Sequence, residues 1–324
     1  MDAIATDNLT MKYGSLVALD HVSIKIPNRS IFGLLGPNGA GKTTMIKLLT
    51  GLVRPTEGDA VVAGYSVRKD PYKVKERIGW VAAEVILDDD LTAWENLWLQ
   101  AKLQNQKDWQ SRARDLLAYF SLTDRMKDRV GRFSTGMRKK LEIALALLHQ
   151  PSVIFMDEPT IGLDPATRGM LWELTRGINR EFGVTIFLTT HYIEEADALC
   201  ETLGILERGK IVALGSPSEL KSRVGGDLIE LETVPPMDVN ILRGLAGVQD
   251  VRDHGKSVIL KVGSAEQTLP ALLRVLPADG VKRVNVEKPN LETVYLDLTG
   301  RRLTEDDTHV DVRKFYTAIR RARQ

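Results

Sequence analysis

The sequence predicts an α/β fold built around a phosphate-binding loop, with an antiparallel β lid, a helical insert and a small α+β domain at the end. Three observations lead to this prediction. A glycine-rich loop, GPNGAGKTT, stands between an apolar run and a helical pattern. A second apolar run, VIFMDE, ends in two carboxylates. Beyond residue 225, short strand and helix patterns follow one another in the order βαββαβ.

The phosphate-binding loop fits the pattern GxxxxGK[ST]. It comprises Gly36, Pro37, Asn38, Gly39, Ala40, Gly41, Lys42, Thr43 and Thr44. Its glycines let backbone N–H groups point at phosphate oxygens, Lys42 would reach the β- and γ-phosphates, and the Thr43 hydroxyl would bind Mg²⁺. The apolar run before the loop predicts a buried strand, and TMIKLLTGL after it predicts a helix whose N-terminus attracts anions. This context supports a nucleotide site.

An antiparallel β lid is predicted from residues 4–26, where apolar and polar residues alternate on both sides of a Gly14-Ser15 turn. Tyr13 ends the first of these strands. An aromatic ring at this position can stack on an adenine face, and it can equally be a half-buried packing residue.

A helical insert in the α/β domain is predicted over residues 85–150. Two helices are expected between residues 91 and 122, because apolar side chains recur there at helical spacing. One such face carries Trp94, Leu97, Trp98 and Ala101. We expect this face to pack in the core rather than to bind a partner.

A further helix is predicted after RFSTGM, with Ser134 as its N-cap and Gly136 close behind. The N-terminus of this helix could bind an anion, far in sequence from the phosphate-binding loop. Taken alone, these residues favour an ordinary capped helix.

Polar side chains follow two predicted core strands at the points where they end. Asp157 and Glu158 close VIFMDE, and His191 follows TIFLTT. Ligands bind at the carboxyl edge of open α/β sheets. There Asp157 would hold Mg²⁺, directly or through water, Glu158 could orient or deprotonate a water, and His191 could donate a hydrogen bond to a γ-phosphate.

Composition is that of an ordinary globular protein. The chain has 324 residues, a formal net charge of +1 and a single cysteine, Cys200. We therefore expect two domains, no internal disulfide and no overall field that attracts nucleic acid. The longest apolar runs fall far short of the roughly 20 residues of a membrane helix, and the N-terminus has no leader pattern. We expect a chain that does not cross a bilayer alone.

The C-terminal part is predicted to contribute regulation or contacts rather than chemistry. Residues 225–300 are expected to form a small α+β domain, whose βαββαβ order is that of a ferredoxin-like fold. Residues 301–324 form a basic tail that ends in KFYTAIRRARQ. The tail is typical of a solvated helix, and a membrane surface or a membrane partner is the alternative.

Taken together, the motifs of residues 4–224 resemble the nucleotide-binding subunit of an ATP-binding-cassette (ABC) transporter. They stand in the family's order: the aromatic Tyr13, the phosphate-binding loop, the signature Ser134-Thr135-Gly136-Met137-Arg138, the VIFMDE strand, the Gly162-Leu163-Asp164 crossing loop and the switch His191. FSTGMRKKLEIALALLHQP and ETVYLDLTG look most like the daunorubicin-resistance branch of multidrug exporters. The resemblance implies a P-loop ABC ATPase domain over residues 1–224 that uses ATP and Mg²⁺.

The same resemblance implies a dimer in which ATP lies between one subunit's phosphate-binding loop and the other's signature. Ser134 and Gly136 would then act in trans, and Glu158, His191 and Lys42 would carry hydrolysis. All of these residues are present in one chain, which favours a homodimer. A separate membrane permease would bind the dimer at the cytoplasmic face of the cell membrane.

Two positions depart from the family pattern. Ala83 stands where a glutamine is usual, so we expect that Glu84 takes its place as a magnesium ligand or that the loop couples differently. Thr135 replaces a glycine of the signature, but Ser134 and Gly136 remain.

Two alternatives remain open on the sequence. One is a soluble ABC ATPase that transports nothing and acts on DNA or ribosomes, although this chain has one cassette and no room for long coiled-coil inserts. The other is a regulatory nucleotide-binding module, against which Glu158 and His191 argue. We expect no nucleic-acid partner.

Overall fold

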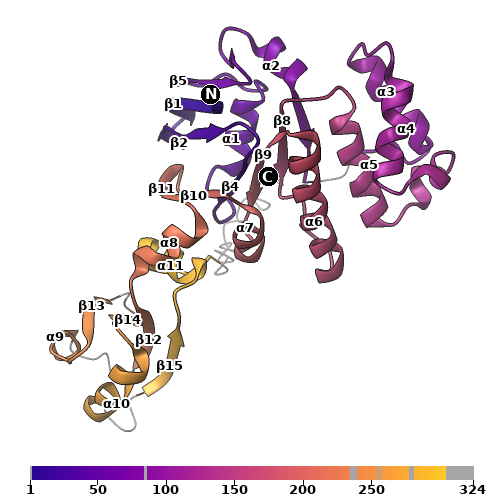
Figure 1. Ribbon diagram of the computed structural model, residues 1–324. Coiled ribbons are helices and arrows are strands. Elements are labelled where there is room, and N and C mark those ends of the chain that lie inside the picture. Colours follow the sequence, from indigo (N-terminus) through magenta and orange to yellow (C-terminus); the bar gives the residue numbers. More distant parts are fainter. Residues whose placement is uncertain are drawn as a thin grey trace, which may run out of the picture. The chain divides into compact units, whose positions relative to one another are not determined.

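The computed structural model describes residues 2–83, 86–233, 239–253, 255, 257–276 and 281–303. The chain divides into two compact units, Met1–Pro217 and Ser218–Gln324. Figure 1 shows the helices and strands of both.

A six-stranded sheet forms the centre of the first unit. Its order is β11-β10-β4-β9-β8-β7. The strands are β4 (Ile31–Leu35), β7 (Ile78–Val81), β8 (Val153–Asp157), β9 (Thr185–Thr190), β10 (Thr202–Glu207) and β11 (Lys210–Gly215). All neighbouring pairs are parallel except β10 and β11. Strands β4, β8 and β9 are buried along their whole length, and their carboxyl ends meet at one edge.

The predicted antiparallel β lid is confirmed. It consists of β1 (Asp2–Tyr13), β2 (Leu16–Val22), β3 (Lys25–Pro27), β5 (Glu57–Val62) and β6 (Tyr65–Ser66). The order is β2-β1-β5-β6, and β3 pairs with β1. Inward-facing residues of these strands share a hydrophobic core with helix α1 (Lys42–Leu49). The lid is therefore packed beside the phosphate-binding loop.

Helices α3 (Ala93–Leu103), α4 (Trp109–Tyr119) and α5 (Thr135–Leu147) gather beside the β7 edge of the sheet (Figure 1). Short 3₁₀ turns at Thr123–Arg125 and Val130–Arg132 connect α4 to α5. A capping box between Thr92 and Glu95 starts α3. The expectation that both tryptophans of α3 are buried is wrong for one of them. Trp94 packs on the Trp109 ring at 4.8 Å, whereas Trp98 is 46% exposed.

Three more helices complete the first unit. They are α2 (Pro71–Arg77), α6 (Pro165–Phe182) and α7 (Ile193–Leu199). The Asp164 side chain caps α6 by accepting from two backbone N–H groups. Within the described part of the chain, no helix combines the length and the apolar composition that crossing a membrane would require.

The second unit is an α+β arrangement with a four-stranded antiparallel sheet in the order β13-β14-β12-β15. Its strands are β12 (Asp227–Thr233), β13 (Val248–Asp253), β14 (Val258–Val262) and β15 (Val281–Glu287), and its helices are α9 (Val239–Arg243), α10 (Ala265–Val275) and α11 (Leu291–Thr299). Helix α8 (Pro217–Val224) joins the units in sequence. A separate core fills this unit, with Ile229, Leu231, Leu260 and Leu272 among its fully buried members.

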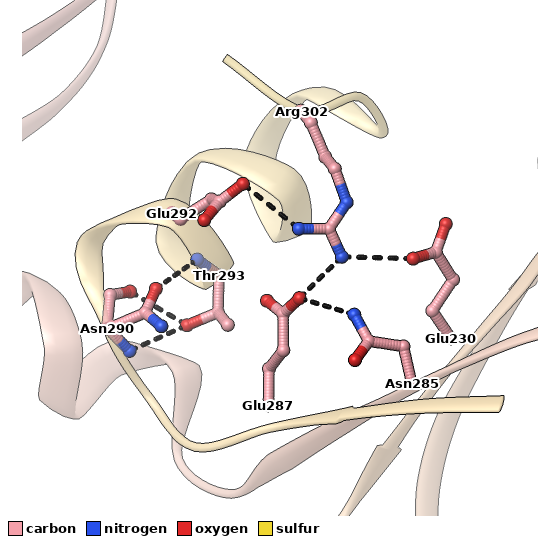
Figure 2. Close-up of polar contacts among 7 residues, drawn as sticks. All are labelled: Glu230, Asn285, Glu287, Asn290, Glu292, Thr293 and Arg302. Atoms are coloured by element: carbon pink, nitrogen blue, oxygen red, sulfur yellow. Dashed lines mark hydrogen bonds and ion pairs between the residues drawn. The ribbon is translucent and has the colours of Figure 1, made fainter. Parts of the chain in front are cut away.

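Arg302, near the end of the described residues, forms ion pairs with three glutamates of this unit. Arg302 pairs with Glu230 on β12, Glu287 on β15 and Glu292 on α11 (Figure 2). Helix α11 itself begins with a capping box between Asn290 and Thr293. Burial lowers the pKa of the guanidinium, but the carboxylates outweigh that effect and raise it overall. We name this group, Arg302 with Glu230, Glu287 and Glu292, the arginine clasp.

Candidate nucleotide-binding and hydrolysis site

The phosphate-binding loop lies between β4 and α1, as its sequence predicts. Gly39 and Gly41 adopt φ angles of 79° and 111°, in the region that favours glycine. A Cβ on Gly36 would lie 2.4 Å from the Leu206 carbonyl oxygen, so the loop also needs glycine there for a close backbone approach. The Gly36 N–H donates to the Thr190 carbonyl at 3.2 Å, which ties the loop to the end of β9.

Lys42 is the first residue of α1 and is 5% exposed. Its Nζ donates to the carbonyl oxygens of Gly36 and Pro37 at 2.7 and 3.0 Å and lies 3.0 Å from Glu158 Oε1. The lysine therefore has its cation at the mouth of the loop, where the α1 N-terminus adds partial positive charge. This position suits a polyanion.

A cavity of about 540 Å³ opens over the loop. Its walls are formed by Tyr13, Leu16, Val17, Ala18, Asn38, Gly39, Gly41, Lys42, Thr43, Thr44, Glu158, Arg208 and Gly209. The structure thus brings Tyr13, most of the phosphate-binding loop and Glu158 together. Gly36, Pro37 and Ala40 belong to the loop without lining the cavity, and Ala40 is buried.

Asp157 and Glu158 stand at the carboxyl end of β8, one buried and the other facing the cavity. Asp157 is 5% exposed and accepts a hydrogen bond of 2.6 Å from the Thr189 hydroxyl on β9. Glu158 turns out of the strand with a φ angle of 46°. Its N–H donates to both the carbonyl and the hydroxyl oxygen of Thr189, each at 3.1 Å.

His191 lies beside the Glu158 carboxylate, with Nδ1 2.9 Å from Oε2. Burial raises the pKa of Glu158, but the hydrogen bond with His191 and the charge of Lys42 outweigh it, so the pKa lies below its ordinary value. Glu158 is consequently ionised at neutral pH and can accept a proton. The Tyr192 ring packs on the imidazole at 4.1 Å between centroids.

The predicted signature residues lie elsewhere in the unit. Ser134 is an exposed N-cap of α5, and its hydroxyl accepts from the Met137 N–H at 3.3 Å. Neither Ser134 nor Gly136 lines the cavity over the phosphate-binding loop. One chain by itself does not bring the signature to this cavity.

The loop after β7, where Ala83 stands in place of the family's glutamine, is only partly described, because Glu84 lies outside the described residues. Just before it, Ala82 donates through its N–H to Glu142 at 3.2 Å and accepts from the Lys139 ammonium at 2.9 Å. Lys139 and Glu142 are buried and paired at 2.8 Å on α5, the signature helix. The loop and that helix are therefore joined by side-chain hydrogen bonds.

Sequence reasoning missed one wall of the cavity. Val17 and Ala18 come from β2, and Arg208 and Gly209 come from the turn between β10 and β11. The Gly209 N–H donates to the Ala40 carbonyl at 2.9 Å, which seats this turn on the loop. No local pattern identifies these residues, since the segments are joined only by the fold.

The donor set suits a nucleotide-bound magnesium ion. Thr43 offers a hydroxyl at the cavity wall and Asp157 a carboxylate at the strand end, and both are hard oxygen donors. Within the described ranges, no three His, Cys, Asp or Glu side chains are grouped to hold a metal by themselves. Mg²⁺ is commonly held by one or two protein oxygens together with phosphates and waters, which agrees with this pattern.

Two family models match the chain. Residues 19–161 match the ABC transporter family, and residues 215–299 match the C-terminal domain of DrrA1-3-like ATP-binding proteins. The first match spans the phosphate-binding loop, the signature and the β8 carboxylates. The second covers most of the α+β unit.

Similar proteins extend along nearly the whole chain. The linearmycin resistance ATP-binding protein of Bacillus subtilis is 37% identical, over 93% of this chain and 100% of that protein. The daunorubicin resistance ATP-binding protein DrrA2 of Streptomyces coeruleorubidus is also 37% identical, over 93% and 96%. Among solved structures, a dimeric ATP-binding cassette with bound ADP and phosphate matches with a TM-score of 0.59 and 27% identity, over 66% of this chain and 98% of that one.

The predicted P-loop fold, the resemblance and its branch are thereby confirmed. This chain belongs to the ATP-hydrolysing subunits of ABC transporters, in the daunorubicin-resistance branch of that family.

Proposed function

We propose that this chain hydrolyses ATP to drive the export of drugs, lipids or other hydrophobic compounds through a separate membrane permease. One observation carries the proposal. A single cavity joins an aromatic ring, a phosphate-binding loop with its lysine, and an ionised carboxylate held by a histidine. The resistance proteins of similar sequence support the exporter branch and argue against a non-transport ATPase.

Each predicted site residue has a role in this proposal. Tyr13 stacks on the adenine, the loop amides and Lys42 hold the phosphates, and Thr43 and Asp157 hold Mg²⁺. When bound, the metal neutralises charge that develops on the phosphates. Glu158 is the general base, and its contact with Lys42 supports the role because it fixes the carboxylate at the cavity.

His191 has a second role beside the base. Its Nδ1 contact with Glu158 holds the imidazole at the end of β9, next to the loop. The ionised Glu158 carboxylate only accepts, so Nδ1 donates to it, and the other ring nitrogen can also donate to a γ-phosphate oxygen when the imidazole is doubly protonated. The histidine would thus connect the presence of that phosphate to the position of Glu158.

Glu84 is proposed as a further magnesium ligand in place of the missing glutamine. The oxygen chemistry of a carboxylate supports this role. A magnesium titration of ATP hydrolysis by Glu84→Ala would test it.

A homodimer is the proposed working form. Ser134 and Gly136 lie outside the cavity of their own chain, and a related cassette was solved as a dimer. In such a dimer, the N-terminus of the partner's α5 would complete the phosphate site. The permease would hold the dimer at the cytoplasmic face of the membrane.

We further propose that residues 1–224 form the ATPase domain, with a helical insert at about residues 85–150, and that residues 225–300 form a ferredoxin-like accessory domain. The antiparallel order β13-β14-β12-β15 supports the second assignment, because it places the first and third strands of βαββαβ in the centre. The basic residues beyond 303 lie outside the described part of the chain.

The proposal is tested by binding and turnover in two variants. Lys42→Ala should bind ATP at least about 10-fold more weakly, since it loses a charged contact with phosphate. Glu158→Gln should keep ATP binding while losing on the order of 10²–10⁴-fold in hydrolysis, as expected when a general base is removed. A fluorescent ATP analogue measures the first quantity and phosphate release the second.

Lys47→Ala is the matched control, because Lys47 lies exposed on the same helix. It should behave like the wild type. Unchanged ATP affinity in Lys42→Ala would contradict the phosphate role, and wild-type turnover in Glu158→Gln would remove that residue as the base.

A further inference from the structure

Thr189 stands between the two carboxylates of the site without lining the cavity. It is the fifth residue of β9, it is 0% exposed, and its backbone pairs with Asp157 on β8. Its hydroxyl oxygen lies 2.6 Å from Asp157 Oδ1 and 3.1 Å from the Glu158 nitrogen. A single buried hydroxyl therefore contacts both members of the carboxylate pair.

The direction of these two bonds follows from their chemistry. A hydroxyl has one proton to donate and two lone pairs to accept with. The Glu158 N–H can only donate, so the Thr189 oxygen accepts from it. The single hydroxyl proton is then donated to Asp157 Oδ1, which accepts it at 2.6 Å.

The geometry of Glu158 depends on the same residue. A φ angle of 46° is uncommon for a side chain larger than glycine and persists only when neighbouring groups hold the backbone. The Thr189 carbonyl and hydroxyl both receive the Glu158 N–H. Through this turn the Glu158 side chain reaches His191 and Lys42.

We propose that Thr189 is a positioning residue for ATP hydrolysis, whose hydroxyl sets the orientation of the Asp157 carboxylate and of the Glu158 backbone together. This inference rests on the proposed roles of those two carboxylates. The Thr189 hydroxyl donates to one oxygen of Asp157, Oδ1.

The test compares Thr189→Val, Thr189→Ser and Thr185→Val. Valine keeps the β-branched shape and removes the hydroxyl, whereas serine keeps the hydroxyl and removes the methyl group. Thr185 is the matched control. It lies at the other end of β9, is 1% exposed, and accepts from the Arg29 N–H at 2.8 Å through its own hydroxyl.

Thr189→Val should lower kcat by about 10- to 100-fold, the range expected for a misplaced catalytic group, with KM for ATP within about threefold of wild type since the phosphate-binding loop is untouched. Magnesium is expected to increase the affinity for a fluorescent ATP analogue, and Thr189→Val should raise the magnesium concentration that gives half of this increase. The affinity is measured at equilibrium, without turnover. Thr189→Ser should recover most of both quantities, and Thr185→Val should retain them.

Equal kcat in Thr189→Val and Thr185→Val would overturn the proposal, because a merely structural hydroxyl predicts equal effects. Failure of serine to recover kcat would overturn it as well. Glu158→Gln is measured in parallel. If that variant keeps wild-type turnover, the proposed base is wrong, and this outcome is distinguishable from a failure of Thr189 alone.

Discussion

The Glu158 carboxylate lies 3.0 Å from the Lys42 ammonium and 2.9 Å from His191 Nδ1, with 14% of its side chain exposed. Burial by itself would raise its pKa, and these two partners reverse that effect. Lys42 also donates to the carbonyl oxygens of Gly36 and Pro37. To bind a phosphate, its ammonium must exchange some of these contacts, including the one with Glu158, for phosphate oxygens. Neutralising Glu158 therefore frees a lysine donor, which is why ATP binding should survive in Glu158→Gln.

The lowered pKa of Glu158 predicts a pH-dependent contribution to stability. A group whose pKa is lower in the folded state stabilises that state fully when the pH is above its pKa in the unfolded chain. This contribution is lost as the pH falls through its pKa in the folded state. The ordinary value is 4.5. Wild type should therefore exceed Glu158→Gln by about 1–3 kcal/mol in free energy of unfolding near pH 7, and the difference should shrink below pH 4.5.

Urea denaturation followed by tryptophan fluorescence measures this difference, since all five tryptophans lie in the first unit. Glu76→Gln is the control, because Glu76 is an exposed carboxylate on α2. A difference between wild type and Glu158→Gln that stays constant from pH 7 to pH 3.5 would contradict the ion-pair account.

At the scale of helices and strands, local motifs predicted the elements that carry the site. Loop glycines, strand-terminal carboxylates and the cap at Ser134 act within a few residues, so their patterns are visible in sequence. The cavity wall at Val17 and Arg208 was not predictable, because strand β2 and the turn between β10 and β11 are far apart in sequence and line the same cavity only in the folded chain. The contact of Thr189 with Asp157 likewise depends on the register between β8 and β9.

The error at Trp98 has a physical reason. The helical spacing of α3 correctly identified a buried face, but its buried residues are Ala93, Asn96, Leu97 and Ala101, and neither Trp94 nor Trp98 is among them. Trp94 lies at its margin and packs on Trp109, and Trp98 falls outside it. Periodicity gives the direction of a buried face and says little about its width.

The arginine clasp gives a prediction for the second unit. Arg302→Met keeps much of the apolar stem and leaves three carboxylates without their cation. These groups are partly exposed, so we expect a loss of about 1–3 kcal/mol in the stability of this unit at pH 7. Far-UV circular dichroism should show the loss, while tryptophan fluorescence, which reports only the first unit, should not change.

Arg283→Met provides the matched control, since Arg283 is exposed on β15 of the same sheet. Its unfolding curve should coincide with that of wild type. Equal curves for Arg302→Met and Arg283→Met would show that the clasp adds nothing measurable to stability.

At the scale of the whole molecule, one chain carries all of the proposed catalytic residues, while Ser134 and Gly136 lie outside the cavity over the phosphate-binding loop. Composition could not have indicated this, since a net charge of +1 and an ordinary apolar fraction describe many proteins. The two units also have separate hydrophobic cores. Each unit can accordingly be probed by its own variants, as the tryptophan distribution allows.

The exposed position of Ser134, away from the cavity of its own chain, has a consequence for mixtures of defective proteins. In the proposed homodimer, Lys42→Ala would damage the phosphate-binding loop and Ser134→Arg would block the signature, so a homodimer of either variant would have no intact site. A mixed dimer concentrates both lesions in one site and leaves the other whole. The two variants carry different tags, are co-expressed, and are purified as the mixed dimer. The mixed dimer should regain ATP hydrolysis, measured as phosphate release. Continued inactivity would argue against sites shared between chains. If the sites are shared in this way, two alleles that each fail alone would rescue each other, because one working site would be built from the products of both.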